Sequence, residues 1–203
     1  MDQPAEELIT TMQLLHRRGW CDGTGGNFSV VVQRQPLRLL MAPSGVDKGS
    51  VTAAELIEVD QNGQVVDGEG RASAETLMHL RIIDACVAGA VLHTHSLAGT
   101  LLSRVQSDRG GVHLEGWEML KGIKGISTHQ SEITIPIVAN NQDLEILSES
   151  AAPHLSRAPH ALLVSGHGLY AWGDDLQEAR RHTEIIEFLL ELSWREALLR
   201  TRQ

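Results

Sequence analysis

The chain joins its short β-branched segments in two different ways, and this mixture restricts the fold more than any other feature of the sequence. The Asn62-Gly63 pair separates the runs LIEVD and VVDG, which predicts a tight hairpin. Other strand-like runs are separated by segments with helical spacing of apolar residues. Because both kinds of connection occur, we expect an α/β fold of three layers, in which helices flank a central, mainly antiparallel sheet.

The order of apolar and turn residues predicts where most elements lie. The segment that starts at Ser73 is expected to be a helix capped by that serine and ended by Gly89, and Pro136 is expected to mark an edge or irregular strand. Helices are expected at 4–18, 73–88, 96–105, 117–123, 143–155 and 176–199, with a short helical turn at 52–55. Strands are expected at 27–33, 36–45, 56–60, 65–68, 90–95, 133–139, 160–164 and 169–173.

Length and composition favour one compact unit. A chain of 203 residues that is 42% hydrophobic can bury one sizeable core, so we expect a single domain over residues 1–203. No run approaches the roughly 18 apolar residues of a membrane span, and the start of the chain lacks the layout of a signal peptide. We therefore expect a cytoplasmic protein with no membrane partner.

Charge and cysteine content exclude several classes of function. The formal net charge of −9 argues against binding to nucleic acid, because neutralisation of phosphates needs a clustered basic surface. Cys21 and Cys86 lie far apart and form no C-x-x-C pair, so two free thiols are expected. The ten histidines are unusual for this length and direct attention to metal and acid–base chemistry.

The stretch AVLHTHS carries the strongest chemical signal. Residues two apart in a strand point to the same face, so His93 and His95 can reach one ion, although two unrelated imidazoles would give the same pattern. His167 lies between glycines in SGHG and offers a third imidazole, which makes a metal site the favoured interpretation. Three neutral histidines with an open position are typical of a catalytic zinc site.

Other protein classes with paired histidines do not fit the neighbouring residues. SLAGT follows the pair where a cupin would have glutamate, and the Asp-His pair of the metallo-β-lactamases is absent. The chain is too short for the barrel of an amidohydrolase, and it has no Pro-Cys-x-x-Cys segment of the zinc deaminases.

Three turn segments offer groups that suit a phosphate. GTGGN exposes backbone N–H groups and an amide, PSG adds a hydroxyl, and SAE lies at an expected helix N-terminus. GTGGN is not a dinucleotide-binding fingerprint, so a nucleotide is not expected. The candidate phosphate ligands are Gly25, Gly26, Asn27, Ser44, Gly45 and Ser73.

GTGGNFS, APSGV, SAET, HTHS and HGLYAWG occur in the order and at the separations typical of one family. The chain resembles, over nearly its whole length, the class II aldolase and adducin head family of zinc-dependent sugar-phosphate enzymes. EGWEMLKGIKGISTHQ and PIVANNQDLEIL further resemble its dehydratase branch, which removes water from a methylthio sugar phosphate in methionine salvage. Ala72 and Ala74 depart from the pattern of the aldolases, which often carry proline and a second serine there.

The resemblance implies the following site. One Zn²⁺ per subunit is held by His93, His95 and His167, and a sugar-phosphate substrate is held by the three turn segments. Glu118 matches the acid–base glutamate of the dehydratases, and Glu75 matches the acid–base position of the aldolases. The family also implies a nine-stranded sheet, a cyclic homotetramer and a site at the subunit interface.

Two alternatives to a dehydratase remain open. A sugar-phosphate aldolase or epimerase would use the same enediolate chemistry, so the site residues alone do not separate these reactions. A non-enzymatic adducin-like interaction module would keep the fold, but it would have no need of three histidines.

Overall fold

The computed structural model describes residues 3–200; residues 1–2 and 201–203, the two ends of the expected domain, lie outside the described residues. Its centre is a nine-stranded sheet with the order β4-β3-β2-β1-β5-β9-β8-β7-β6, in which only the β7–β8 pair is parallel. The strands are β1 Asn27–Arg34, β2 Leu37–Met41, β3 Ile57–Asp60, β4 Val65–Asp67, β5 Ala90–Thr94, β6 Gly111–Glu115, β7 Glu132–Val138, β8 Ala161–Val164 and β9 Gly168–Gly173.

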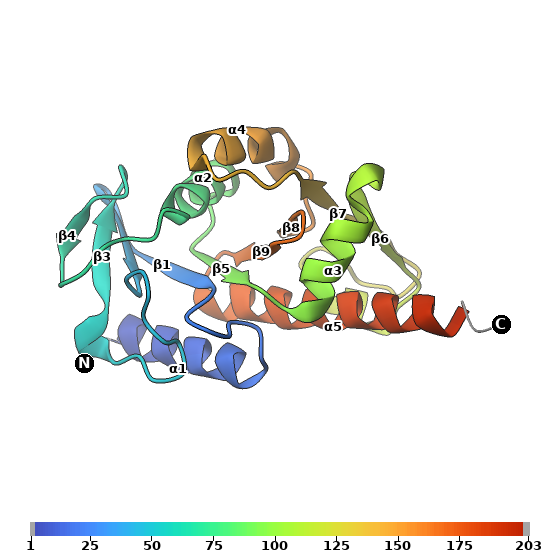
Figure 1. Ribbon diagram of the computed structural model, residues 1–203, viewed down its shortest axis with the longest axis horizontal. Coiled ribbons are helices and arrows are strands. Elements are labelled where there is room, and N and C mark those ends of the chain that lie inside the picture. The colour runs from blue at the N-terminus through green and yellow to red at the C-terminus, as the bar shows by residue number, and fades with distance from the viewer. Residues whose placement is uncertain (1–2, 201–203) are drawn as a thin grey trace.

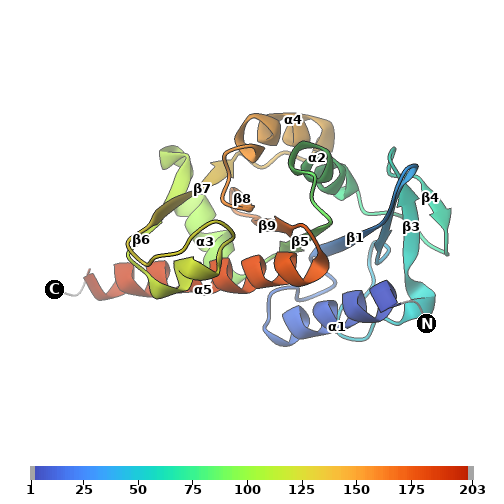
Figure 2. The same cartoon turned by 180° about the vertical axis from the view of Figure 1, so that it is seen from behind.

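Helices cover both faces of the sheet, so the three-layer prediction is confirmed (Figure 1). Helices α2 and α4 pack against one another on one face, and α1, α3 and α5 lie on the other (Figures 1 and 2). The helices are α1 Gln3–Arg17, α2 Thr76–Cys86, α3 Leu97–Val105, α4 Leu144–Leu155 and α5 Leu176–Arg200; the short 3₁₀ segments are η1 Ala53–Glu55, η2 Ser107–Arg109 and η3 Glu118–Gly122.

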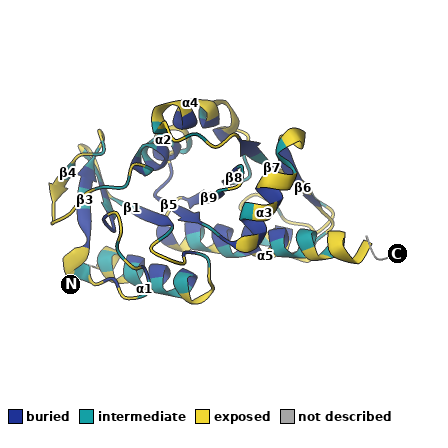
Figure 3. Cartoon of the chain, viewed as in Figure 1, coloured by how far each residue is buried: buried dark blue, intermediate teal, exposed yellow. Residues whose placement is uncertain are grey.

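Strand alternation divides the core between the two faces. On β9, Tyr170 and Trp172 pack with the α2–α4 layer, whereas Leu169 and Ala171 pack with α5. Because neighbouring residues of a strand point to opposite faces, each central strand contributes to two apolar clusters. The buried residues therefore follow the middle of the sheet, and the exposed ones follow the outer helix faces (Figure 3).

The helix from Ser73 begins and ends differently from the prediction. Ser73–Glu75 form a turn closed by the bond from the Thr76 N–H to the Ser73 carbonyl, so α2 starts at Thr76. The helix ends at Cys86, and Val87 rather than Gly89 adopts the left-handed conformation, with φ 53°. Gly89 is required for another reason, because a Cβ there would lie 1.9 Å from the Asp174 carbonyl oxygen.

Of the two expectations from Pro136, an edge or an irregular strand, the first is wrong: β7 is not an edge strand, but its pairing changes from antiparallel to parallel beside Pro136. Strand β6, which the sequence analysis missed, covers it and forms the edge of the sheet. Pro136 pairs with Gly111 at the last position of the β6 ladder, and the parallel pairing with β8 begins at Ile137. The missing N–H of proline is tolerated at this junction between two ladders.

Two further expectations can be compared with the described residues. Cys21 and Cys86 are free thiols, as predicted. No helix within residues 3–200 is both long and apolar enough to span a membrane.

Candidate metal centre and substrate cavity

Strand β5 and the turn between β8 and β9 bring the three predicted histidines together. His93 shares the face of β5 that carries Val91, and its ring stacks on Tyr170 of the neighbouring strand β9, with centroids 4.0 Å apart. His95 lies just beyond the end of β5, where its backbone N–H donates to the Trp20 carbonyl over 2.7 Å. His167 occupies the β8–β9 turn, so adjacent strands supply all three imidazoles.

Glycines let the backbone segments approach closely enough for this convergence. A Cβ at Gly168 would lie 2.1 Å from the Thr94 carbonyl oxygen, and a Cβ at Gly25 would lie 2.9 Å from Nδ1 of His95. Gly26 has φ +77°, and a Cβ there would meet the His93 carbonyl oxygen at 2.8 Å. The GTGGN turn is therefore packed directly against His93 and His95.

The side-chain nitrogens of the three histidines point at one another. The Nε2 atom of His93 lies 2.8 Å from Nε2 of His95 and 3.3 Å from Nε2 of His167. The Nδ1 atom of His93 lies 2.9 Å from the Leu169 carbonyl, which accepts only, so Nδ1 carries the proton and Nε2 presents its lone pair.

Glu75 completes this group. The sequence indicates it only as an acid–base candidate. Its Oε1 atom lies 3.0 Å from Nε2 of His167 and 3.5 Å from Nε2 of His93. The other carboxylate oxygen accepts a hydrogen bond from the side-chain amide of Asn27. Glu75 is the last residue of the Ser73 turn and directly precedes α2, so the start of this helix lies beside the histidines.

The donor set fits a divalent metal ion. The three nitrogens and the carboxylate oxygen all lie within 4.8 Å of one another. A zinc ion with ligands at about 2.0–2.1 Å in tetrahedral geometry separates neighbouring ligand atoms by roughly 3.3 Å. The observed separations of 2.8 to 3.5 Å bracket that value, and a cation would relieve the repulsion between the facing lone pairs.

Burial and the neighbouring side chains together set the charge states of His95 and Glu75. Burial lowers the pKa of His95 to about 4, and the nearby His93 and His167 add to the shift, so the imidazole is neutral and able to bind a metal at neutral pH. For Glu75, burial opposes ionisation, but the neighbouring imidazoles of His167 and His93 outweigh it and lower the pKa of the carboxyl group. Glu75 is therefore a carboxylate at neutral pH.

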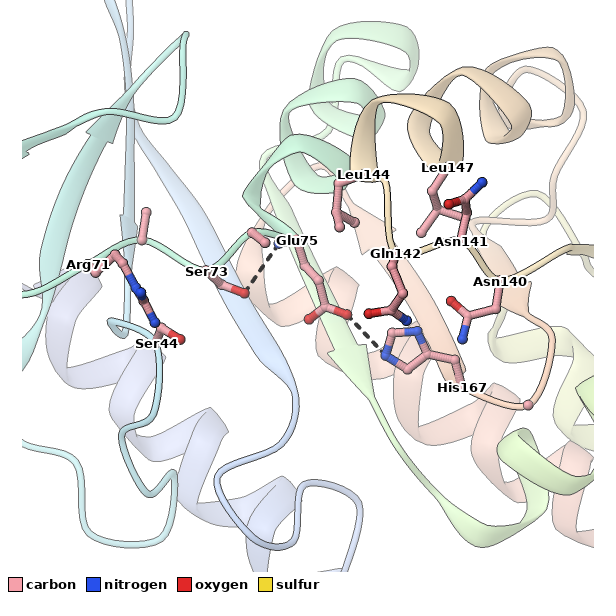
Figure 4. A pocket seen from close by; sticks show the side chains of 13 residues that line it. Ser44, Arg71, Ser73, Glu75, Asn140, Asn141, Gln142, Leu144, Leu147 and His167 are labelled. Atoms are coloured by element: carbon pink, nitrogen blue, oxygen red, sulfur yellow. Dashed lines mark hydrogen bonds and ion pairs between the residues drawn. The ribbon is translucent and has the colours of Figure 1, made fainter.

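A cavity of about 760 Å³ opens beside Glu75 and His167. Ser44 and Ser73, two of the predicted phosphate ligands, line one side of it, and Arg71 lies with them (Figure 4). The other side carries side chains from the start of α4 and the segment before it, among them Asn140, Asn141, Gln142, Leu144 and Leu147. The sequence analysis missed Arg71 and the three amides, although a run of amides directly after a strand was a usable signal.

The other four predicted phosphate ligands, Gly25, Gly26, Asn27 and Gly45, do not line this cavity. Gly25 and Gly26 pack against the histidines, and the amide of Asn27 is directed to Glu75. Gly45 adopts φ +83° in the PSG turn, where a Cβ would meet no atom within 4 Å.

Glu118 lies apart from the histidine group within its own chain. Its side chain is 70% exposed on η3, where the Lys121 ammonium donates to it over 2.7 Å. This hydrogen bond and the charge of Lys121 lower the pKa of Glu118. Helix α5 separates η3 from α3, the helix that follows His95 (Figures 1 and 2).

Comparisons with known proteins agree with this geometry. Residues 6–194 match the family model described as class II aldolase and adducin N-terminal domain. The methylthioribulose-1-phosphate dehydratase of Stenotrophomonas maltophilia (strain K279a) is 42% identical, over 91% of this chain and 87% of that protein. The enzyme of the same name from Serratia proteamaculans (strain 568) is 39% identical, over 99% of this chain and 98% of that protein.

Solved structures show the same fold. YgbL from Escherichia coli superposes with a TM-score of 0.80 at 26% identity, over 93% of this chain and 86% of that chain. The L-fuculose-1-phosphate aldolase of Thermus thermophilus superposes with a TM-score of 0.78 at 24% identity, over 97% of this chain and 96% of that chain. From the family match and these relatives, the chain belongs to the class II aldolase and adducin family.

Proposed function

We propose that this chain is a zinc-dependent hydro-lyase that converts 5-methylthioribulose 1-phosphate to 2,3-diketo-5-methylthiopentyl 1-phosphate and water, a step of methionine salvage. The observation that carries the proposal is the convergence of Glu75 and three histidines in a chain about 40% identical, over nearly its full length, to dehydratases of that name. A bound zinc ion would act as a Lewis acid on the substrate carbonyl and stabilise the enediolate.

The chain's own groups account for the other requirements of the reaction. Ser44, Ser73 and Arg71 offer two hydroxyls and a cation to the phosphate at one end of the cavity. We assign removal of the C3 proton to the Glu75 carboxylate, which lies beside the three histidines. Loss of the C4 hydroxyl needs a proton from a general acid, because hydroxide is a poor leaving group, and we assign this proton transfer to Glu118.

An exposed Glu118 can serve this role only if it reaches the site of a neighbouring subunit. The surface of α3 supports an assembly of copies, because Leu97 and Val105 are 69% and 70% exposed and Leu101 lies between them on the same helix face. Helix α3 starts two residues after His95, so an interface along it would border the metal group. We therefore propose a homotetramer with its sites at subunit interfaces.

Product analysis tests the proposed reaction. The zinc-loaded protein should convert methylthioribulose 1-phosphate to a product lighter by one water in mass spectrometry. Two smaller fragments would instead identify an aldolase, and an isomer of unchanged mass would identify an epimerase. An aldolase is the second candidate because the solved relative from Thermus thermophilus has that activity in its name.

His95→Ala separates metal-dependent catalysis from a merely structural role of the histidines. We expect this variant to fold but to bind less than one zinc ion per chain, because one of three imidazole ligands is removed. Its turnover number should fall at least a hundredfold. Elemental analysis and activity should be measured on the same sample. Full zinc content together with full activity would contradict the metal assignment.

A further inference from the structure

Lys48 is a cation buried beneath two of the turns that the sequence associates with phosphate. Only 2% of its surface is exposed, and its ammonium donates to the Thr24 carbonyl over 3.1 Å and to the Val46 carbonyl over 2.7 Å. Thr24 belongs to the GTGGN turn, and Val46 directly follows the PSG turn. One side chain thus ties together two segments that are distant in sequence.

The charge of Lys48 has no carboxylate in contact with it among the described residues. The nearest acidic neighbour in sequence, Asp47, is engaged by the Gly49 N–H, the Ser50 hydroxyl and the His16 ring. Asp47 and Glu75 act on Lys48 only as more distant charges, and burial lowers the pKa of its ammonium. A buried cation without a paired anion costs free energy, which two neutral carbonyls offset only in part.

An anion between the two turns would balance this charge. Ser44 of the PSG turn lines the cavity, and the Lys48 ammonium lies between the carbonyls of Thr24 in the GTGGN turn and of Val46, which follows the PSG turn. The chain carries a net charge of −9, and Glu75 faces the same cavity, so an unassisted phosphate would meet unfavourable electrostatics. Arg71 offers a cation in the lining of the cavity, and Lys48 would offer a second, buried positive charge in the segment that follows Ser44.

We propose that Lys48 is a positioning residue for the phosphate group of the substrate. It holds the GTGGN and PSG turns at a fixed separation through their carbonyls and provides a buried positive charge behind their N–H groups. It does not touch the substrate, because its ammonium is covered by the turns. The proposal rests on the proposed function in so far as the substrate is a phosphate ester.

Lys48→Met tests the proposal, because methionine keeps the unbranched shape and removes the charge. We expect the zinc-loaded variant to fold and to keep its zinc, while KM for the phosphorylated substrate rises at least tenfold and kcat changes less than threefold. The dissociation constant of inorganic phosphate, measured by calorimetry, should rise by the same factor as KM. Lys124→Met is the matched control, since it removes an exposed lysine paired with Asp174 and should leave both constants unchanged.

A second variant separates the charge from the hydrogen bonds. Lys48→Gln keeps a donor for the turn carbonyls without the charge, so phosphate affinity should lie between those of the wild type and Lys48→Met. Wild-type affinity for inorganic phosphate in either variant would overturn the proposal. Because this measurement involves no turnover, failure of the proposed dehydration leaves it interpretable.

Hydrogen exchange on the unmodified protein provides a test that does not depend on folding of a variant. Saturating inorganic phosphate should slow exchange of the backbone amides in both turns, at 24–27 and 44–46, together. Protection confined to one turn, or absent from both, would overturn the inference that Lys48 makes them one phosphate site.

Discussion

Thr94 and Ser96, the hydroxyl residues on either side of His95, both donate hydrogen bonds to the buried carboxylate of Glu187 on α5. Thr94 points away from the metal group because strand neighbours face opposite sides of the sheet. Ser96 also accepts the Gly99 N–H at the start of α3 over 2.9 Å. Glu187 therefore fixes the backbone that carries His95 without touching the imidazole.

Glu187 should make stability depend on pH. Burial raises its pKa from 4.5 to about 7, although the Ser96 and Thr94 hydroxyls oppose the shift. The folded chain thus binds the proton of the Glu187 carboxyl group more tightly than the unfolded chain does. The stabilisation of the fold by this bound proton is complete below pH 4.5 and is lost as the pH rises through about 7. The loss from this group should reach roughly 3 kcal/mol at pH 8.

Glu187→Gln isolates this contribution, because the amide has no such titration. Urea unfolding at several values between pH 5 and 8 should give a flatter dependence of the unfolding free energy on pH for the variant than for the wild type. Parallel curves for the two proteins would show that the Glu187 carboxylate is not protonated in this range.

At the scale of elements, the approach of β9 to β5 depends on Gly168. Its absent side chain lets the start of β9 pass the Thr94 carbonyl, where a Cβ would lie at 2.1 Å, far inside van der Waals contact. The pair Thr94–Leu169 is the last register position of the β5–β9 ladder, next to the histidine turn. Displacement there would move His167 away from the other two imidazoles.

Gly168→Ala should therefore destabilise the chain by about 2–4 kcal/mol and weaken zinc binding more than tenfold, because backbone rather than a flexible side chain must move. Gly166→Ala in the same turn is the control; it should cost about 1 kcal/mol for its left-handed conformation, with zinc affinity retained. Denaturant unfolding and zinc titration measure both quantities. Equal effects of the two substitutions would refute the close-approach argument.

Elements that are determined by adjacent residues could be predicted from the sequence. Elements that depend on contacts with distant segments of the chain could not. The Asn62-Gly63 hairpin and the short helical turn at 52–55 follow from neighbouring residues, and both are present. Strand β6 was missed because only Val112 and Leu114 alternate in it, too short a pattern to recognise. The same limit applies to Arg71, whose place in the cavity depends on contacts between distant segments.

At the scale of the whole molecule, Glu118 can take part in catalysis only if it reaches the metal group of another copy of the chain. The sequence could indicate Glu118 as a candidate but not its distance from the histidines, which depends on the fold and on assembly. Its 70% exposure and the exposed face of α3 are consistent with a site shared between subunits.

Mixed oligomers test this arrangement. Glu118→Gln and His95→Ala should each be inactive alone, because one lacks the proton donor and the other lacks the metal. When the two variants are unfolded together and refolded, some sites should combine an intact metal group with an intact Glu118 of another subunit, and activity should return. Size analysis and mass spectrometry should confirm that mixed assemblies form. If these zinc-loaded assemblies stay inactive, Glu118 and the metal act in the same chain.

The central strand β5 also has a consequence for when the metal can bind. Its partners β1 and β9 come from opposite ends of the sequence, so His93 lies between Asn27 on one side and Tyr170 on the other. Pairings between such distant segments form slowly, because large loops must close first. A nascent chain carries His93 and His95 well before the ribosome has made His167. Zinc acquisition should therefore follow synthesis of β9, and the ion would stabilise an already assembled sheet rather than nucleate it.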